Sequence, residues 1–286
     1  MRKIFILVFI LSTLSFAQND SDSTFGSLFI IGGGSRPNYM IEEFVKMAGG
    51  DSAKIIVIPT ASSEPAKTGK YQSEQFTGFG ASADYILTEG GEITDSITNK
   101  FEDVTGVFFS GGDQSRLTKA LLDSEILDEI KKIFFEGGVI GGTSAGAAVM
   151  SKIMITGDEA LNKEDEKFIN IQKGNIITSE GFGFVDNAVV DQHFLYRKRH
   201  NRLISLVLEN PAIIGIGIDE STAAIFSSKN RFRVLGENQV IVYSAVKADK
   251  IETNKNGLFS AENLRMDILT SGCCYDIDNK NIIECD

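Results

Sequence analysis

The chain has 286 residues, of which 42% are apolar, and its formal net charge is −11. This length fits one large α/β domain or two small ones; because no proline-rich linker, low-complexity stretch or internal repeat divides the chain, we expect one. The acidic balance argues against nucleic acid and anionic membranes as partners, since phosphate binding needs clustered Lys and Arg, and it favours a cationic or zwitterionic substrate.

Residues 1–17 have the three-part pattern of a secretory signal. Met1-Arg2-Lys3 is basic, residues 4–11 are apolar, and Ser15-Phe16-Ala17 provides a cleavage site. The apolar run is too short to span a bilayer, which takes roughly 20 residues; a buried first strand is the alternative. We therefore expect an exported protein, periplasmic or extracellular, with a polar leader over residues 18–25.

Short apolar runs that end in Gly or Pro alternate with stretches of helical spacing over the next part of the chain. Strands are expected at 27–31, 54–58, 85–87, 107–109 and 139–140. Helices are expected at 40–48, 116–122 and 125–135. This alternation is typical of a mostly parallel sheet sandwiched by helices. Ligands of such sheets bind at the carboxyl ends of the strands.

A denser pattern of strands follows. A run at 188–190 leads into Asp191-Gln192-His193, a helix is expected over 201–208, and further strands are expected at 213–218, 223–226, 232–235 and 240–243. We expect these strands to extend the sheet, partly in antiparallel pairs, so that the α/β domain covers residues 26–250.

Residues 251–286 form a tail whose structure the pattern does not predict. The tail holds all three cysteines of the chain, Cys273, Cys274 and Cys285. In an exported protein, one disulfide and one spare thiol are expected. Adjacent cysteines rarely pair, so Cys285 would bond with Cys273 or Cys274 and staple the tail. No His lies nearby, which argues against a metal site.

Gly142-Thr143-Ser144-Ala145-Gly146 matches the G-x-S-x-G pattern of a nucleophile elbow. It lies between a predicted strand and an apolar helix, which is the setting that such an elbow requires. The turn would lift the Ser144 hydroxyl above the sheet and aim the helix N-terminus at a developing oxyanion. A tight structural turn is the alternative; in this context we expect Ser144 to be a nucleophile.

A serine nucleophile needs a base, usually His, and the chain has two, His193 and His200. His193 follows a predicted strand, where a loop would face the site, whereas His200 is expected on a helix. Glu220 is our candidate for the residue that orients the His193 ring, and Asp219 is its rival; strand alternation would point these two carboxylates in opposite directions. The order Ser, His, Glu differs from that of the α/β-hydrolases, which argues against a lipase or esterase of that fold.

Two other strand ends are rich in glycine. Gly32-Gly33-Gly34 is followed by Pro37 where a dinucleotide fingerprint has its third glycine, and no P-loop is present; nucleotide binding is unsupported. A second glycine pair lies on the strand expected beside the elbow strand. There a backbone N–H of Gly112 or Asp113 would be placed to join that of Ala145 in an oxyanion hole. A tight turn alone is the alternative.

A basic cluster, Arg197, Arg199 and Arg202, follows His193 closely in an otherwise acidic chain. A solvated face explains most such runs. Because these residues lie near the proposed base, some of them would instead bind a substrate carboxylate, for which the guanidinium fork is suited.

Four segments together resemble the cyanophycinases, which belong to a serine peptidase family that also contains the α-aspartyl dipeptidases. The segments are FFSGGDQSRL (Phe108–Leu117), GGTSAGAAVM (Gly141–Met150), VVDQHFLYRKRHNRL (Val189–Leu203) and GIGIDESTA (Gly215–Ala223). The third segment resembles the cyanophycinase branch rather than the dipeptidase branch. The resemblance extends from the first strand to about Tyr243.

The resemblance implies a class I glutamine amidotransferase-like α/β sandwich with Ser144, His193 and Glu220 as a triad, and it implies no metal or organic cofactor. It also assigns substrate contacts to Gln114, Asp191, Gln192, Arg197, Arg199 and Arg202. The implied substrate is cyanophycin, a poly-aspartate backbone with arginine on each β-carboxyl group, which is cleaved to β-Asp-Arg dipeptides. The oligomeric state, including a homodimer, stays open.

Two features depart from the family pattern: the export signal, since cyanophycin is stored inside cells, and the cysteine-containing tail. An exported enzyme would act on polymer released by other organisms. Two alternatives remain. One is a serine peptidase of the same fold for other aspartyl or isoaspartyl peptides. The other is an inactive secreted peptide-binding protein, against which the intact Ser, His and Glu argue.

Overall fold

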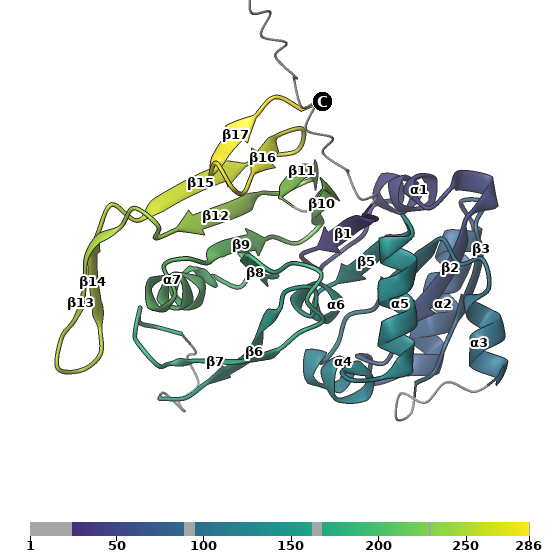
Figure 1. Cartoon of the computed structure of the whole chain (residues 1–286), viewed down its shortest axis with the longest axis horizontal. Helices are drawn as coiled ribbons and strands as arrows, with labels where there is room; N and C mark the ends of the chain where they lie inside the picture. Colours follow the sequence, from purple (N-terminus) through teal and green to yellow (C-terminus); the bar gives the residue numbers. More distant parts are fainter. Residues whose placement is uncertain (1–24, 89–94, 162–167, 229, 286) are drawn as a thin grey trace, which may run out of the picture.

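The computed structural model describes residues 25–88, 95–161, 168–228 and 230–285 (Figure 1). It shows a mixed α/β fold with a parallel central sheet flanked by helices and with antiparallel strands toward the C-terminus. Within these ranges, no helix is both long and apolar enough to cross a membrane. The expected signal sequence, and the expected leader up to residue 24, lie outside the described residues.

In the described chain, the central sheet has nine strands in the order β17-β16-β11-β10-β1-β5-β4-β2-β3. Its parallel part consists of β1 (Ser27–Ile31), β5 (Val139–Thr143), β4 (Gly106–Phe109), β2 (Lys54–Ile58) and β3 (Ser82–Tyr85). Most residues of β1, β2, β4 and β5 are buried, as a parallel sheet covered on both faces requires. The registers Ile31↔Thr143 and Phe109↔Gly142 align the carboxyl ends of β1, β5 and β4 at the same end of the sheet.

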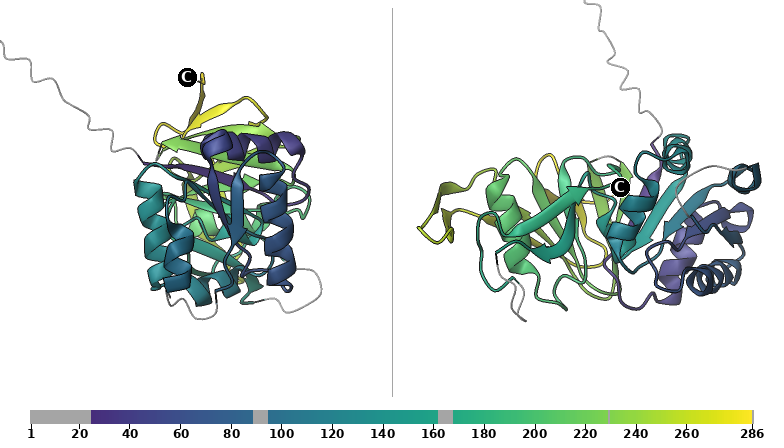
Figure 2. Two further views of the ribbon diagram at one scale, coloured as in Figure 1. Left: turned by 90° about the vertical axis from the view of Figure 1, so that its right-hand side faces the viewer. Right: turned by 90° about the horizontal axis from the view of Figure 1, so that it is seen from below.

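Helices cover both faces of the parallel strands (Figure 2). One face packs against α1 and α2 through Phe44 and Phe76, and the other packs against α4 and α5 through Leu117 and Ile130. The apolar residues of α5 recur at helical spacing, and the Ser124 hydroxyl caps its first turn. The helices are α1 (Asn38–Met47), η1 (Gly50–Ser52), α2 (Pro65–Thr77), α3 (Asp95–Phe101), α4 (Gln114–Leu121) and α5 (Glu125–Phe135).

The strands after residue 188 do not all extend the central sheet. Of the strands expected there, β10 (Thr222–Ser228) and β11 (Arg231–Gly236) join the central sheet: β10 pairs antiparallel with β1, and β11 pairs antiparallel with β10. A separate sheet has the order β15-β12-β9-β8, and α7 packs on it through Leu203 and Val207. The chain crosses between the two sheets from β9 into β10, again from β11 into β12, and again from β15 into β16. The elements of this second layer are β8 (Ala188–Asp191), α7 (His200–Glu209), β9 (Ile214–Ile218), β12 (Val240–Ser244) and β15 (Arg265–Leu269).

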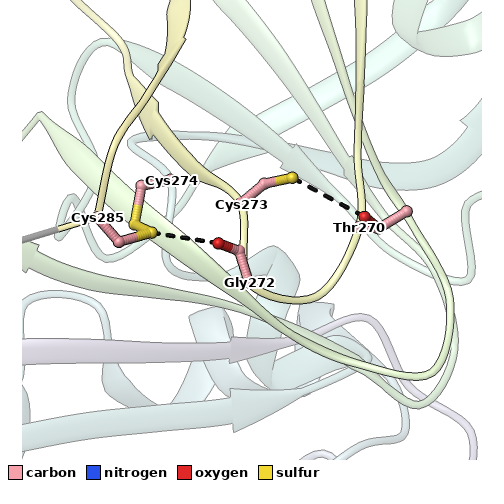
Figure 3. The surroundings of a disulfide bond; sticks show 5 residues. All are labelled: Thr270, Gly272, Cys273, Cys274 and Cys285. Atoms are coloured by element: carbon pink, nitrogen blue, oxygen red, sulfur yellow. Dashed lines mark hydrogen bonds between the residues drawn. A yellow bond between two sulfur atoms is a disulfide. The ribbon is translucent and has the colours of Figure 1, made fainter.

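The C-terminal tail is ordered into short strands. β16 (Cys274–Asp276) and β17 (Asn281–Ile283) continue the central sheet beyond β11. A disulfide joins Cys274 to Cys285 and ties the end of the tail to β16, whereas Cys273 keeps a free thiol that faces Thr270 (Figure 3). Of the two pairings that the sequence left open, the structure therefore has the one with Cys274.

Two hairpins complete the fold. β6 (Ile153–Glu159) pairs with β7 (Ile176–Glu180), and β13 (Asp249–Thr253) pairs with β14 (Phe259–Glu262). The second hairpin projects from the end of the molecule opposite to α3 (Figure 1).

Candidate active site

Ser144 lies on the sharp turn between β5 and α6 (Ala145–Ala148). Its backbone angles, φ 54° and ψ −108°, fall in a sparsely populated region that costs a non-glycine residue about 1–3 kcal/mol. The turn is so tight that a β-carbon at Gly142 would lie 2.4 Å from the carbonyl oxygen of Gly146. The expected nucleophile elbow is therefore present in the backbone geometry, and it presents the Ser144 hydroxyl to the loops beyond the strand ends.

The side chains of Ser144, His193 and Glu220 form one hydrogen-bonded chain. Ser144 Oγ lies 2.8 Å from His193 Nε2, and His193 Nδ1 lies 2.6 Å from Glu220 Oε1. A carboxylate can only accept hydrogen bonds, so the His193 Nδ1–H donates to Glu220. His193 Nε2 is then left to accept the proton of the Ser144 hydroxyl, which is the tautomer that a general base needs.

The three residues come from two different sheets. Ser144 follows β5 of the central sheet, whereas His193 and Glu220 follow β8 and β9, neighbouring parallel strands of the second sheet. Because β8 and β9 run in the same direction, their carboxyl ends lie side by side and place the imidazole next to the carboxylate. The candidate site is therefore built where the carboxyl ends of strands from the two sheets meet.

Three consecutive carbonyl groups at the end of β1 hold the backbone of this site. The Ile31 carbonyl accepts a hydrogen bond from the Ser144 amide at 3.1 Å, and the Gly32 carbonyl accepts one from the His193 amide at 2.7 Å. The Gly33 carbonyl accepts one from the amide of Ser221, the residue after Glu220, at 2.9 Å. We call residues 31–33 the carbonyl bracket. The sequence analysis did not predict that these carbonyl groups hold the backbone of the site. The feature of the sequence that could have indicated it is the run of three glycines, Gly32-Gly33-Gly34, directly after a strand.

Gly33 also gives the His193 ring its space. A β-carbon at Gly33 would lie 2.3 Å from Cε1 of His193. Gly33→Ala is therefore expected to displace the ring from Ser144 and to lower kcat/KM by about 100-fold, the scale of a 1 Å misplacement. Hydrolysis rates and thermal unfolding of the variant measure the effect.

Gly49→Ala is the matched control for Gly33→Ala. The φ of Gly49, 117°, is nearly that of Gly33, 115°, so both substitutions strain the backbone alike. A β-carbon at Gly49, however, would have its nearest neighbour at 3.6 Å. Equal losses of activity in the two variants would mean that backbone strain, and not the ring of His193, accounts for the effect.

The two rivals from the sequence have other partners. The Oδ1 of Asp219 accepts hydrogen bonds from the amides of Leu195 and Tyr196 at 3.0 and 2.9 Å. It therefore fixes the backbone just after His193. The second histidine, His200, lies at the start of α7, where its Nδ1 is 2.7 Å from the Tyr243 hydroxyl. The structure brings neither of them into contact with Ser144.

The oxyanion candidates lie on two turns beside Ser144. Ala145 begins α6 directly after the nucleophile, and the turn after β4 passes close by, because a β-carbon at Gly111 would lie 3.3 Å from that of Ser144. On that turn, the amide of Asp113 already donates to the Ala61 carbonyl at 2.9 Å, and its carboxylate caps α4. The amide of Gly112 donates no hydrogen bond within the described ranges, which favours Gly112 over Asp113 as partner of Ala145.

Burial lowers the pKa of His193 from its ordinary value of 6.5. The hydrogen bond to Glu220 acts in the opposite direction, whereas the positive charges of Arg197 and Arg199 lower this pKa further. A lowered pKa keeps the imidazole neutral, and thus competent as a base, at neutral and mildly acidic pH.

We expect kcat/KM to remain high below pH 6.5 and to fall as the pH drops through the lowered pKa of His193, because protonation removes the base. Folding stability should also fall as the pH drops below 6.5, since the unfolded chain then binds the proton more readily than the folded chain.

Arg197→Ala removes a charge that lowers the pKa of His193, so the acid limb of the kcat/KM profile should move to higher pH at low ionic strength. Arg197→Lys keeps the charge and is the control; a limb that both substitutions leave in place would contradict this account.

Two of the expected substrate contacts are engaged with each other. Asp191 and Arg202, whose side chains are 0% and 2% exposed, form a two-point ion pair between β8 and α7. A buried pair of this kind is strongly destabilised when one partner is removed. In this structure, Asp191 and Arg202 support the strand that carries His193.

The other side chains expected to contact substrate differ in their exposure and in the hydrogen bonds they already make. Gln114 donates to the carbonyls of Ile155 and Thr156 at 3.0 and 2.6 Å and so ties α4 to β6. The half-buried Arg199 donates to the backbone and side-chain oxygens of Gln192, and burial together with the charges of Arg202 and Arg197 lowers its pKa to about 10. Arg197 is exposed.

Comparison with known proteins places the chain among peptidases. The model of peptidase family S51 matches residues 28–234. A cyanophycinase from Synechococcus elongatus is 33% identical over 262 residues, which cover 88% of this chain and 79% of that protein. A cyanophycinase from Trichormus variabilis is 30% identical over 287 residues, which cover 96% of this chain and 93% of that protein.

Among solved structures, a peptidase from an acI-B1 actinobacterium superposes with a TM-score of 0.64. The match covers 89% of this chain and 98% of that chain, at 22% sequence identity. At this identity, the likeness concerns the fold alone.

Proposed function

Because this chain belongs to peptidase family S51, a family of serine peptidases, we propose that it is an exported cyanophycinase-like enzyme. Ser144, His193 and Glu220 are its catalytic residues, and the aspartate backbone of cyanophycin is its substrate. The observation that carries the proposal is the unbroken hydrogen-bonded chain from Ser144 through His193 to Glu220.

The mechanism is covalent. His193 Nε2 takes the proton of the Ser144 hydroxyl while Oγ attacks the backbone carbonyl of an aspartyl unit. The amides of Ala145 and Gly112 stabilise the oxyanion of the tetrahedral intermediate. His193 then gives its proton to the leaving amine, which departs and leaves an acyl-enzyme on Ser144. A water molecule, deprotonated by His193, attacks the ester, and the serine is released with its proton restored.

The choice of substrate rests on the relatives and on charge. The relatives that cover most of this chain bear the name cyanophycinase. Each unit of cyanophycin offers a free carboxylate, for which Arg197 and Arg199 beside His193 are suited, and a guanidinium, which suits an acidic protein. Export rests on the signal pattern of residues 1–17 alone, and it would bring the enzyme to polymer outside the cell.

The test is digestion of insoluble cyanophycin by the protein that begins at Gln18, beside a Ser144→Ala blank. Release of soluble β-Asp-Arg by the wild type alone, read by mass spectrometry, is the expected result. A folded wild type whose Ser144 reacts with a serine-directed reagent, but which releases no dipeptide, would remove the polymer as substrate and keep the serine peptidase.

A shorter aspartyl or isoaspartyl peptide is the second candidate substrate. The mutual pairing of Asp191 and Arg202 favours it, because two of the groups expected to bind a long polymer are already engaged. If cyanophycin is the substrate, Arg199→Ala should lower its hydrolysis by about 10- to 100-fold, the range for a hydrogen bond to a charged group. Hydrolysis of a simple aspartyl dipeptide should then change little, and Lys198→Ala serves as the neighbouring control. Equal losses on both substrates would favour the short peptide.

A further inference from the structure

A small cavity opens at the amino ends of β1 and β5. Its volume is about 100 Å³, and its lining includes the buried side chains of Leu28 and Phe226. The two chain segments beside it are held together by the Gly26 amide, which donates to the Phe134 carbonyl at 2.7 Å. Ser144 follows the carboxyl end of β5, a five-residue strand roughly 17 Å long. The cavity is therefore separate from the candidate active site.

Phenylalanine rings make up most of the wall of this cavity. Phe25 and Phe135 are 40% and 58% exposed, and their ring centres lie 5.7 Å apart. Phe134 is buried and lies 6.4 and 5.6 Å from these two rings and 5.3 Å from the ring of Phe184. A buried cavity of about 150 Å³ with apolar walls can hold benzene. This smaller, open cavity therefore suits a single phenyl or branched alkyl group.

Lys131 adds a positive charge to the apolar lining. It precedes Phe134 and Phe135 on α5 by three and four residues, which places the three side chains on one face of the helix. Lys131 is half-buried, and in the described part of the chain no hydrogen bond or ion pair engages its ammonium group. Its neighbour Lys132, in contrast, is exposed and pairs with Glu129 at 2.9 Å. A partly desolvated ammonium group without a partner favours the binding of an anion.

The surroundings do not supply this anion together with an apolar group. Asp186, the other charged residue of the lining, already has an interaction partner. Residues 18–24 precede the cavity in the sequence and have only polar side chains, of which Asp20 and Asp22 are acidic. They offer no apolar group that could fill the space between the phenylalanine rings. One molecule with an apolar body and a negative charge would satisfy both the rings and Lys131.

We propose that this cavity binds a small carboxylic acid that carries one phenyl or branched alkyl group. The apolar group enters between the phenylalanine rings, and the carboxylate pairs with Lys131. A single ammonium group suits a singly charged carboxylate, whereas phosphate sites gather several cations or backbone amides. The expected Kd is about 1 mM, the scale for a ligand of about ten non-hydrogen atoms. The inference does not depend on the proposed function.

Titration with 3-phenylpropionate, followed by NMR, tests the charge. The protein that begins at Gln18 should bind this acid with a Kd of about 1 mM, and it should bind the neutral 3-phenylpropanamide at least about tenfold more weakly. Lys131→Gln should weaken binding of the acid by about tenfold and leave binding of the amide unchanged. Lys132→Gln is the matched control and should change neither. Equal affinities of the wild type for the acid and the amide would overturn the assignment of Lys131.

Removal of one ring tests the cavity. Phe135→Ala deletes part of the wall, so the acid and the amide should both bind about fivefold more weakly. Tyr71→Ala is the matched control, because Tyr71 is also 58% exposed and also lies on a helix, but does not line the cavity. Equal losses in the two variants would overturn the placement of the ligand in the cavity.

Two competing placements have tests of their own. The acid could pair instead with the arginines beside His193, but Arg199→Ala should leave its Kd unchanged; a loss of binding would move the ligand to the candidate active site. A protein that begins at Thr24 should bind the acid as the longer protein does. Tighter binding would mean that Asp20 or Asp22 is the partner of Lys131.

The proposal as a whole fails if the folded wild type binds no 3-phenylpropionate at concentrations up to about 10 mM, tenfold above the expected Kd. Circular dichroism and thermal unfolding establish that each variant is folded.

Discussion

Replacing Ser144 with alanine is expected to lower kcat by roughly 10⁴- to 10⁶-fold without unfolding the protein. In the proposed mechanism, the substitution removes the atom that attacks the substrate, so no acyl-enzyme should form. The Ser144 hydroxyl bonds only to His193 in the described structure and does not cap α6, so its removal should change the free energy of unfolding by about 1 kcal/mol or less. Steady-state kinetics and thermal unfolding measure the two effects.

Ser110→Ala is the control for Ser144→Ala. Ser110 is buried at the same edge of the sheet, directly after β4, and its hydroxyl bonds the Ile58 carbonyl at 3.4 Å. Loss of this hydroxyl should leave kcat within a few-fold of wild type. A serine-directed reagent should add its mass to the wild type and to Ser110→Ala but not to Ser144→Ala. Turnover or labelling that persists in Ser144→Ala would remove Ser144 as the nucleophile.

Glu220→Gln is expected to lower kcat by about 10³- to 10⁴-fold. In the proposed mechanism, the neutral amide would no longer stabilise the imidazolium formed when His193 takes the Ser144 proton, and its NH₂ group could hold the ring in the wrong tautomer. The hydrogen bond to Glu220 raises the pKa of His193, so the acid limb of the kcat/KM profile should move to lower pH in this variant. A pH series of kcat/KM measures both changes.

The adjacent carboxylate provides the control. Asp219→Asn keeps an Oδ1 that can accept from the amides of Leu195 and Tyr196, so the loop after His193 should stay in place. We expect a loss of less than about tenfold and no movement of the acid limb. If Asp219→Asn lost as much activity as Glu220→Gln, Glu220 would no longer be distinguished as the partner of His193.

The parallel core and the three linked side chains could be predicted from the sequence because their signals are local. Apolar runs ending in glycine marked β1, β4 and β5, and the G-x-S-x-G pattern marked the turn at Ser144. Strand alternation separated Glu220 from Asp219, and the structure points them to different partners. With only two histidines in the chain, the choice of His193 followed from its place after a strand.

The remaining features depend on contacts between distant segments or on weak patterns. α2 was missed because Phe76 is its only buried apolar residue apart from Gly69, so helical spacing was not visible. We expected a strand at 85–87, but β3 lies at Ser82–Tyr85. Its side chains are only partly buried, so the sequence there lacks the apolar run that would have marked it. The second sheet was not expected, since the sequence does not show that β12 pairs with β9 and β15 rather than with the central sheet. The buried pairing of Arg202 with Asp191 is likewise a tertiary contact.

The carbonyl bracket also determines when a growing chain can first become a peptidase. Residues 31–33 are synthesised early, but their partners arrive in turn: Ser144 first, His193 later, and Ser221 last. A nascent chain that already contains the nucleophile therefore has no base, and one that contains both still lacks Glu220 and the strands that carry it. If Ser144, His193 and Glu220 act as proposed, hydrolytic activity can therefore appear only after Ser221 has been synthesised and the two sheets have packed together.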